Sequence, residues 1–93
     1  MAIKVSLPTA FTRHTGGAKQ FDSAAENLPA LLADIDKTYP ALSNQIKDGD
    51  GKLRRFINVY VNDEDIRFLG GETYAFQEGD EIMLIPSIAG GAA

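Results

Sequence analysis

The stretch FINVYV at residues 56–61 decides the fold class of this chain. Its β-branched residues at positions 57, 59 and 61 point to one face, while Phe56 and Tyr60 point to the other. A period of two, with β-branched residues on the apolar face, is typical of a β-strand that is buried on one side. The rest of the chain must therefore supply a second layer to cover that side of a sheet.

A helix predicted at residues 28–39 provides this layer. Asn27 is a good N-cap, because its side-chain oxygen can accept a hydrogen bond from a free backbone amide of the first turn. Pro29 lies in the first turn, where no intrahelical donor is lost, and Pro40 ends the helix. The apolar residues that follow the helical period are Leu28, Leu31, Leu32, Ile35 and Tyr39. They form one stripe that can cover a sheet.

Three further segments carry strand patterns. Residues 3–7 alternate apolar and polar side chains until Pro8, residues 18–21 return from a loop at 9–17, and residues 81–86 form the last strand. The other predicted elements are a helical turn near 42–46, a polar turn at 62–65, a short edge strand at 66–69, a helical turn at 72–76 and a tight turn at 78–80.

Together these elements predict an α+β roll, with a mixed sheet of four or five strands and one main helix on one face. Residues 1–86 would form this domain, and residues 87–93 a flexible C-terminal tail. Strand parity leaves four apolar side chains on the uncovered face, namely Phe56, Tyr60, Met83 and Ile85. Such a group is typical of a docking surface, although parity alone also allows ordinary scattered surface hydrophobics.

The charge and composition exclude several classes of protein. The chain has 93 residues, a net charge of −4 and no cysteine, which excludes a disulfide, a thiolate nucleophile and a cysteine-based metal site. Lys52, Arg54 and Arg55 form the one basic cluster and acids surround it, which argues against nucleic-acid binding. Neither a membrane-spanning stretch nor a signal peptide is present, so we expect a soluble cytoplasmic protein with no membrane partner.

The residues predict no catalytic or metal site within the chain. His14 is the single histidine, and without cysteine it has no second strong metal ligand. Residues 48–51, DGDG, resemble the opening of a calcium loop, but the twelfth position, which needs a glutamate, is Val59. The acids at 63–65 are consecutive and typical of a solvated turn. The chain also lacks a glycine-rich nucleotide loop, so we expect it to bind no cofactor itself.

The strongest functional signal is Gly90-Gly91, which follows the last predicted strand. The other two Gly-Gly pairs lie between structured segments and are typical of turns. A segment without Cβ atoms can thread a channel that bulkier residues would block, although it could also be a frayed end.

Several motifs then point to a known family. They are VN at 61–62, GDEI at 79–82 and PSIAGG at 86–91. On these motifs the chain resembles the sulfur-carrier proteins of the ThiS and MoaD type, which have the β-grasp (ubiquitin-like) fold. A finer resemblance, to CysO-type carriers for cysteine synthesis, rests on LPT at 7–9, HTGG at 14–17 and RFINVYVNDEDIRF at 55–68.

The resemblance implies a carrier that partner enzymes act on, and not an enzyme. An E1-like adenylyltransferase of the ThiF or MoeB type would bind the sheet and adenylate the terminal glycine. Sulfide or a persulfide donor would then displace AMP and leave a thiocarboxylate. A PLP-dependent sulfhydrylase or similar enzyme would accept the sulfur to make cysteine, homocysteine or methionine, and a JAMM-type metalloprotease would release the product. ATP, PLP and zinc would belong to these partners.

The resemblance also implies roles for the tail. Gly91 would carry the acyl group with Gly90 providing clearance, and Ile88 and Ala89 would lie in the channel of the partner. The four apolar residues of the uncovered face would dock the partner.

The sequence departs from the family pattern because Ala92-Ala93 follow Gly91. Two extended residues add up to ~7 Å, and their methyl groups would enter a channel shaped for glycine. We therefore expect a pro-form that is cut between Gly91 and Ala92, by the JAMM-type protease. The alternatives are that both alanines are tolerated or that no sulfur is carried. Two other functions also stay open: a MoaD-like small subunit of molybdopterin synthase, and a ubiquitin-like modifier joined to lysines of target proteins.

Overall fold

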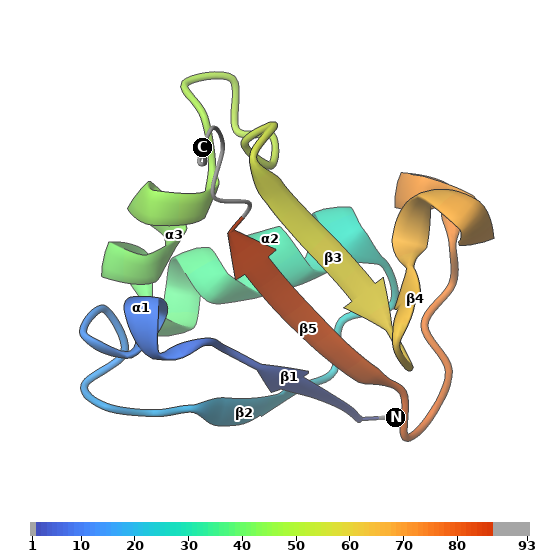
Figure 1. Ribbon diagram of the computed structural model, residues 1–93, viewed down its shortest axis with the longest axis horizontal. Helices are drawn as coiled ribbons and strands as arrows, with labels where there is room; N and C mark the ends of the chain where they lie inside the picture. Colours follow the sequence, from blue (N-terminus) through green and yellow to red (C-terminus); the bar gives the residue numbers. More distant parts are fainter. Residues whose placement is uncertain (1, 87–93) are drawn as a thin grey trace.

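The computed structural model describes residues 2–86, which form a five-stranded sheet and helices (Figure 1). In chain order the elements are β1 (Ile3–Ser6), α1 (Thr9–Thr12), β2 (Gln20–Ser23), α2 (Leu28–Thr38), α3 (Pro40–Ile46), β3 (Ile57–Val61), β4 (Glu64–Asp65), the 3-10 helices η1 (Ile66–Leu69) and η2 (Gly71–Thr73), and β5 (Glu81–Pro86). The strands lie in the order β2-β1-β5-β3-β4. β1 and β5 are parallel and the other neighbours antiparallel, which confirms the predicted α+β roll with a mixed sheet.

The main helix, α2, begins and ends close to where the sequence predicts. The Asn27 side chain accepts a hydrogen bond of 2.9 Å from the Ala30 amide, which satisfies a free donor of the first turn. Pro40 follows the C-cap residue Tyr39 and begins α3, because the ring of a proline cannot continue the preceding helix. The buried residues of α2 are Leu28, Leu31, Leu32 and Ile35. The predicted apolar stripe therefore faces the core.

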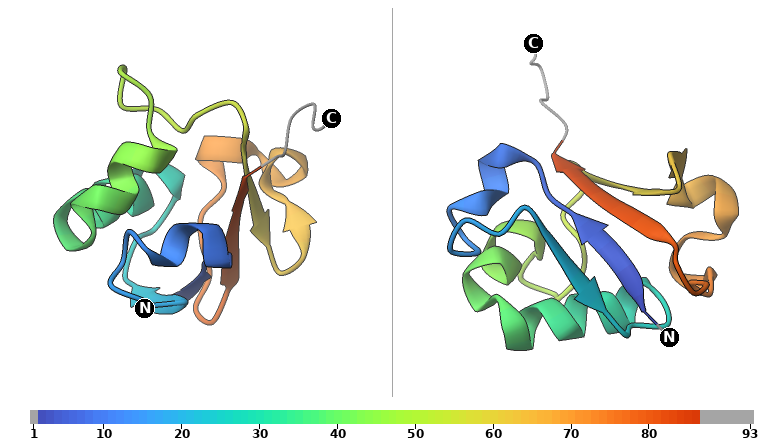
Figure 2. Two further views of the ribbon diagram at one scale, coloured as in Figure 1. Left: turned by 60° about the vertical axis from the view of Figure 1, so that its left-hand side comes forward. Right: turned by 90° about the horizontal axis from the view of Figure 1, so that it is seen from below.

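The core lies between the sheet and helices α2 and α3, which are on the same side of the sheet (Figure 2). Ile57, Val59 and Val61 of β3 are buried, as the alternation predicts. Ile82 and Leu84 of β5 have no exposed surface. The pairing places Val59 opposite Leu84 and Val61 opposite Ile82, so the central strands present one continuous apolar face to the helices.

The segment after β1 is more ordered than predicted. Residues 9–17, expected to be a loop, begin with α1, whose Phe11 is buried in the core. Burial of an aromatic ring stabilises this turn, but a pattern over so few residues cannot reveal it. The returning strand is β2, which begins and ends two residues later than the predicted 18–21, and its antiparallel pairing with β1 confirms the hairpin. The helical turn expected near 42–46 is the longer helix α3.

The edge strand predicted at residues 66–69 is wrong, because these residues form η1. The Asp65 side chain accepts a hydrogen bond of 2.9 Å from the Arg67 backbone amide, and this cap turns the chain out of the ladder. The edge strand is instead β4, whose pairing among the described residues is limited to Tyr60 and Val61. The helical turn predicted at 72–76 is the shorter η2, which begins one residue earlier and ends at Thr73, because Tyr74 is already extended.

The polar turn predicted at residues 62–65 is shorter than expected. Only Asn62 and Asp63 form it, with φ of 51° and 72°, and the next two residues already pair in β4. Positive φ at both central positions is the geometry of a two-residue hairpin turn, and asparagine and aspartate tolerate it better than most residues.

Residues 87–93, which the sequence assigns to a tail, lie outside the described residues. Between residues 2 and 86, none of the helices has the length and apolar character needed to cross a membrane.

Candidate functional site

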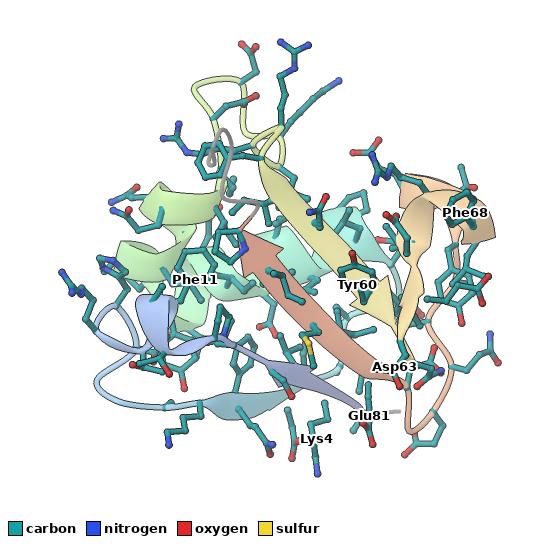
Figure 3. The ribbon with its side chains drawn as sticks, in the orientation of Figure 1. Lys4, Phe11, Tyr60, Asp63, Phe68 and Glu81 are labelled. Atoms are coloured by element: carbon teal, nitrogen blue, oxygen red, sulfur yellow. The ribbon has the colours of Figure 1, made fainter. Side chains whose placement is uncertain are left out.

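The side of the sheet that points away from α2 and α3 brings together three of the four predicted docking residues. Tyr60 of β3, labelled in Figure 3, lies opposite Met83 of β5. Ile85 lies two residues further along β5, on the same face as Met83. Met83 is 39% exposed, and Tyr60 and Ile85 are half-buried. We refer to these three residues as the open-face cluster.

Phe56, the fourth predicted docking residue, lies just outside the strand. β3 begins at Ile57, which pairs with Pro86, the last residue of β5. Phe56 is 44% exposed, so its ring is available to solvent at the end of the sheet where β5 ends. The structure therefore places Phe56 next to the end of β5 instead of within the ladder.

A hollow of about 270 Å³ adjoins the open-face cluster. Met83 and Ile85 line it from β5, and Ser6, Leu7 and Pro8 line it from the end of β1. Ser6 pairs directly with Met83 in the parallel ladder. The sequence-based prediction of the docking surface did not include these three residues, because local patterns do not show which distant strands become neighbours. The one available signal was the position of Ser6 in its strand, because alternation with the apolar residues places its side chain on the open face.

The two ends of the open face differ in polarity. Lys4 of β1 pairs with Glu81 at the start of β5, and both side chains are exposed (Figure 3). The apolar cluster and the hollow lie further along, where β5 ends. The apolar part of this face is therefore the part nearest to the point where the chain continues toward residues 87–93.

A buried polar network holds the start of β5. The Asp80 carboxylate is 7% exposed, and three donors reach it. They are the Asn62 side-chain amide, the Tyr74 hydroxyl and the Gln77 backbone amide, each at 2.9 Å. The Asn62 side-chain oxygen accepts a further hydrogen bond of 3.0 Å from the Glu81 amide. The network thus ties the β3–β4 turn to β5.

These hydrogen bonds decide the charge of Asp80. Burial raises the pKa of Asp80, but the hydrogen bonds from Gln77, Asn62 and Tyr74 together outweigh burial, so its pKa lies below the usual 3.8. The hydrogen bond to this carboxylate, together with burial, raises the pKa of Tyr74 above its usual 10.0. At neutral pH Asp80 is therefore ionised and Tyr74 keeps its proton, which makes the network a stable structural clamp.

The residues predicted to carry sulfur, to enter the channel of a partner and to be cut all lie outside the described residues. They are Ile88, Ala89, Gly90, Gly91 and Ala92. The structure describes the strand that leads to them, β5, as far as Pro86.

The segments rejected as metal sites have local structural roles. His14 is half-buried in the turn after α1, where its backbone amide donates to the Phe11 carbonyl at 3.0 Å. The Asp48 carboxylate accepts hydrogen bonds from the backbone amides of Asp50 and Lys52, at 2.9 and 3.0 Å, so residues 48–51 form a turn. Within residues 2–86, no group of three or more histidine, cysteine, aspartate or glutamate side chains could hold a metal ion.

The fold and the open face can now be compared with known proteins. The sequence matches the ThiS family over residues 5–91. The chain belongs to the ThiS family. Sulfur carrier protein CysO of Mycobacterium tuberculosis is 42% identical over 93 residues, which cover 98% of this chain and 100% of CysO. The match to the family extends beyond the described residues and includes Gly90-Gly91.

Solved structures confirm the fold expected for a member of the ThiS family. The Amycolatopsis orientalis BexX/CysO complex contains a chain with a TM-score of 0.83 and 37% identity, covering 96% of this chain and 99% of that one. Small archaeal modifier protein 1 (SAMP1) of Methanosarcina acetivorans also has a TM-score of 0.83, with 29% identity over 97% of this chain and 96% of its own. The chain therefore has the β-grasp fold and is a homologue of sulfur carrier protein CysO.

Proposed function

We propose that this chain is a cytoplasmic sulfur carrier that holds sulfur as a thiocarboxylate on Gly91. The observation that carries the proposal is the 42% identity to sulfur carrier protein CysO along 98% of the chain. The family match to residue 91 supports Gly91 as the position of the functional carboxylate. A carrier of this kind supplies a reactive group to other enzymes and needs no catalytic residues of its own.

Loading proceeds in two balanced steps on a free Gly91 carboxylate. A carboxylate oxygen attacks the α-phosphorus of ATP, pyrophosphate leaves, and an acyl-adenylate forms. Sulfide then attacks the acyl carbon and AMP leaves, so that one carboxylate oxygen is exchanged for sulfur. Activation is necessary because a carboxylate oxygen is a poor leaving group. ATP is held by the partner, an E1-like adenylyltransferase of the ThiF or MoeB type.

A free carboxylate at Gly91 requires a cut, because Ala92 follows Gly91 in the sequence. We propose that water hydrolyses the Gly91–Ala92 bond in the active site of a JAMM-type metalloprotease, whose zinc activates the water. Until this cut the acyl group of Gly91 is an amide, which cannot be adenylated.

The open-face cluster and Phe56 are the proposed docking surface for the adenylyltransferase. The partly exposed Tyr60 and Met83 pair across the two central strands, and the hollow beside Met83 can receive an apolar side chain. This apolar region lies where β5 ends, so a partner bound there is also close to the start of the tail. Ile88 and Ala89 would then enter its channel, and Gly90 would give clearance.

Sulfur transfer from Gly91 is proposed to serve the synthesis of a sulfur amino acid. The acceptor would be a PLP-dependent sulfhydrylase or a similar enzyme, which holds its own cofactor. The name of the relative, sulfur carrier protein CysO, supports the carrier role.

Intact-mass spectrometry tests the loading step. A chain that ends at Gly91 is incubated with the E1-like enzyme of the same organism, ATP and sulfide, and compared with the full sequence that keeps Ala92-Ala93. We expect the mass change of one oxygen-to-sulfur exchange in the shorter chain only. The absence of this change in the shorter chain, with an enzyme that is active on its own carrier, would contradict the proposal.

Substitution of Met83 tests the docking surface. We expect Met83→Asp to lower kcat/KM for adenylation by about thirtyfold, the effect of losing one interface hot spot of about 2 kcal/mol. Lys4→Ala, on the charged end of the same face, is the matched control and should leave the rate nearly unchanged. Equal rates for the two variants would show that the partner binds elsewhere.

The similarity to SAMP1 supports a second candidate function, a protein modifier. In this case Gly91 would form an isopeptide bond with a lysine of a target protein. Mass spectrometry of the protein isolated from its own cells separates the two functions: a carrier is recovered as a free chain with sulfur in place of oxygen, and a modifier as conjugates.

A further inference from the structure

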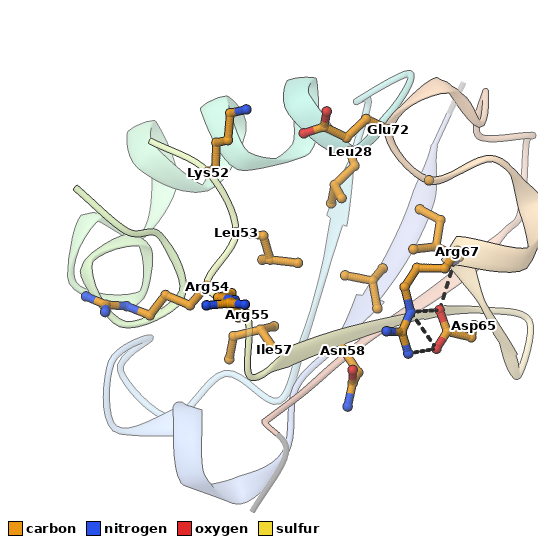
Figure 4. A pocket seen from close by; sticks show the side chains of 13 residues that line it. Leu28, Lys52, Leu53, Arg54, Arg55, Ile57, Asn58, Asp65, Arg67 and Glu72 are labelled. Carbon is orange, nitrogen blue, oxygen red and sulfur yellow. Dashed lines mark hydrogen bonds and ion pairs between the residues drawn. The ribbon is translucent and has the colours of Figure 1, made fainter. Parts of the chain in front are cut away.

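A groove of about 320 Å³ lies beside β3, on the edge of the sheet near the start of α2 (Figure 4). None of the residues that line it belongs to the open-face cluster, but Asn58, which pairs with Ile85, comes from the open face, so the groove borders that face at the edge of the sheet. Its floor is apolar, and the apolar residues that line it are Leu28, Leu53, Ile57, Val59 and Ile66. The groove therefore offers apolar surface between the edge of the sheet and the helical layer.

The edge of β3 in this groove is open to a further strand. β4 pairs with Tyr60 and Val61, and within residues 2–86 no strand pairs with 57–59 on that side. The backbone amide of Asn62 donates to the Glu81 carbonyl. In an antiparallel ladder this means that the even-numbered residues of β3 direct their backbone N–H and C=O groups to β5. Ile57 and Val59 consequently direct their backbone N–H and C=O groups to the groove. The Ile57 backbone amide is already bonded to the Arg54 carbonyl, so within residues 2–86 the Val59 amide and the Ile57 carbonyl are left at the edge.

The charges around the groove favour an anionic occupant. Four basic residues and two acidic residues line it, namely Lys52, Arg54, Arg55 and Arg67 against Asp65 and Glu72. Arg67 is bound to Asp65 at 2.6 Å, and the Arg54 side chain reaches the Asn44 carbonyl at 3.4 Å. Lys52 and Arg55 are exposed at one end of the groove. This local excess of positive charge occurs in a protein whose net charge is −4.

We propose that the groove binds an extended acidic segment of a partner protein, which adds to the sheet beside β3. Alternate side chains of the segment would lie on Leu28 and Leu53, and its carboxylates would face Lys52 and Arg55. A nucleic-acid strand fits less well, because the lining contains no aromatic side chain for base stacking. The site does not depend on sulfur transfer, and it would give the carrier a second contact that can select one partner among several.

A peptide titration followed by NMR tests this site. The probe is the peptide Glu-Val-Glu-Val-Glu with blocked ends, and the matched control is Lys-Val-Lys-Val-Lys. We expect the acidic peptide to shift the amide signals of Leu53, Ile57 and Val59 in a saturable way, and the basic peptide to leave them unchanged. A third peptide, methylated on the backbone nitrogen of its central residue, should bind more weakly because it cannot donate a hydrogen bond to β3.

Protein variants complete the test. We expect the double variant Lys52→Glu/Arg55→Glu to weaken binding of the acidic peptide about tenfold, since each exposed charge contact contributes modestly. Lys19→Glu, an exposed charge near β2 on the opposite edge of the sheet, is the control and should keep the affinity. Both variants change surface charges only, and a retained amide spectrum verifies that they fold.

Several results would overturn the proposal. Equal binding of the acidic and basic peptides would exclude charge selection, and equal binding of the methylated peptide would exclude strand addition. Shifts confined to Met83 and Ile85 would assign the peptide to the open face. Tighter binding of oligouridine at the same amides would replace the protein partner with a nucleic acid.

Discussion

Asparagine in place of Asp80 should destabilise the protein by removing one acceptor from a buried network. One carboxylate oxygen accepts from Asn62, and the other accepts from both Tyr74 and Gln77. An asparagine side chain has one oxygen, which accepts, and one NH₂ group, which donates. In either orientation its NH₂ group therefore faces a donor that the carboxylate of Asp80 accepts from. Asn62 cannot relieve the clash by turning its amide, because its oxygen already accepts from the Glu81 amide.

The better orientation of the new amide loses one hydrogen bond, the one from Asn62, and weakens the two others by removing the charge. A hydrogen bond to a charged group contributes about 1.5–3 kcal/mol, and a buried donor left without a partner adds a similar penalty. We therefore expect Asp80→Asn to lower the free energy of unfolding by about 2–3 kcal/mol at pH 7.

Urea denaturation at several pH values measures this effect, with Asp63→Asn as the control. Asp63 also loses one charge, but it is exposed in a turn with φ of 72°, which asparagine tolerates. The pKa of Asp80 in the folded protein is lower than 3.8. The contribution of ionised Asp80 to the free energy of unfolding is thus fully present above the pKa that this group has in the unfolded chain. It is lost as the pH falls through the lower pKa of the folded protein. The difference in the free energy of unfolding between wild type and Asp80→Asn should therefore become smaller below about pH 4.

The reasoning would be refuted by an Asp80→Asn variant within about 0.5 kcal/mol of the wild type at pH 7. It would also be refuted if the same loss persisted at a pH where wild-type Asp80 is protonated, since the charge would then play no part.

Four further substitutions can be checked by the same denaturation measurement at pH 7. Leu84→Ala should lower the free energy of unfolding by about 2–5 kcal/mol, because Leu84 has no exposed surface, whereas Met83→Ala on the open face should have a much smaller effect; similar losses for both would contradict the assignment of faces. Asn27→Ala should lower it by about 1 kcal/mol through the lost cap of α2, and an unchanged stability would show that the cap is not needed. Asp63→Val should lower it by about 1–3 kcal/mol, because a β-branched residue is strained at positive φ, and a tolerated valine would mean that the turn changes its conformation.

The elements that local patterns predicted well are those that repeat over many residues. The helix at Leu28–Thr38 combines a cap, a terminating proline and an apolar stripe of three turns, and each signal agrees with the others. The strand at Ile57–Val61 alternates in burial and the strand at Glu81–Pro86 is a short apolar run, and the parity of both strands assigned Tyr60, Met83 and Ile85 to one face. Where several local rules agree, few alternative conformations are open to that segment of the chain.

The predictions failed where a single long-range contact or cap decides the structure. One buried ring, Phe11, holds α1, and one hydrogen bond from the Arg67 backbone amide to the Asp65 side chain turns residues 66–69 into a 3-10 helix. Such features leave no period in the sequence. The acceptor role of Asp80 was missed for the same reason, since its donors come from three separate segments.

The sequence by itself determined the α+β class, the main helix, the central strands and the di-glycine motif of the ThiS family. Only the tertiary structure decided that β1 lies beside β5, which brings Ser6 to Met83 and creates the hollow at the open face. It also decided that β4 is short, which leaves the edge of β3 open beside a basic groove. The physical reason is that periodicity reports which side of an element is buried, whereas strand neighbours are selected by packing between segments far apart in the chain.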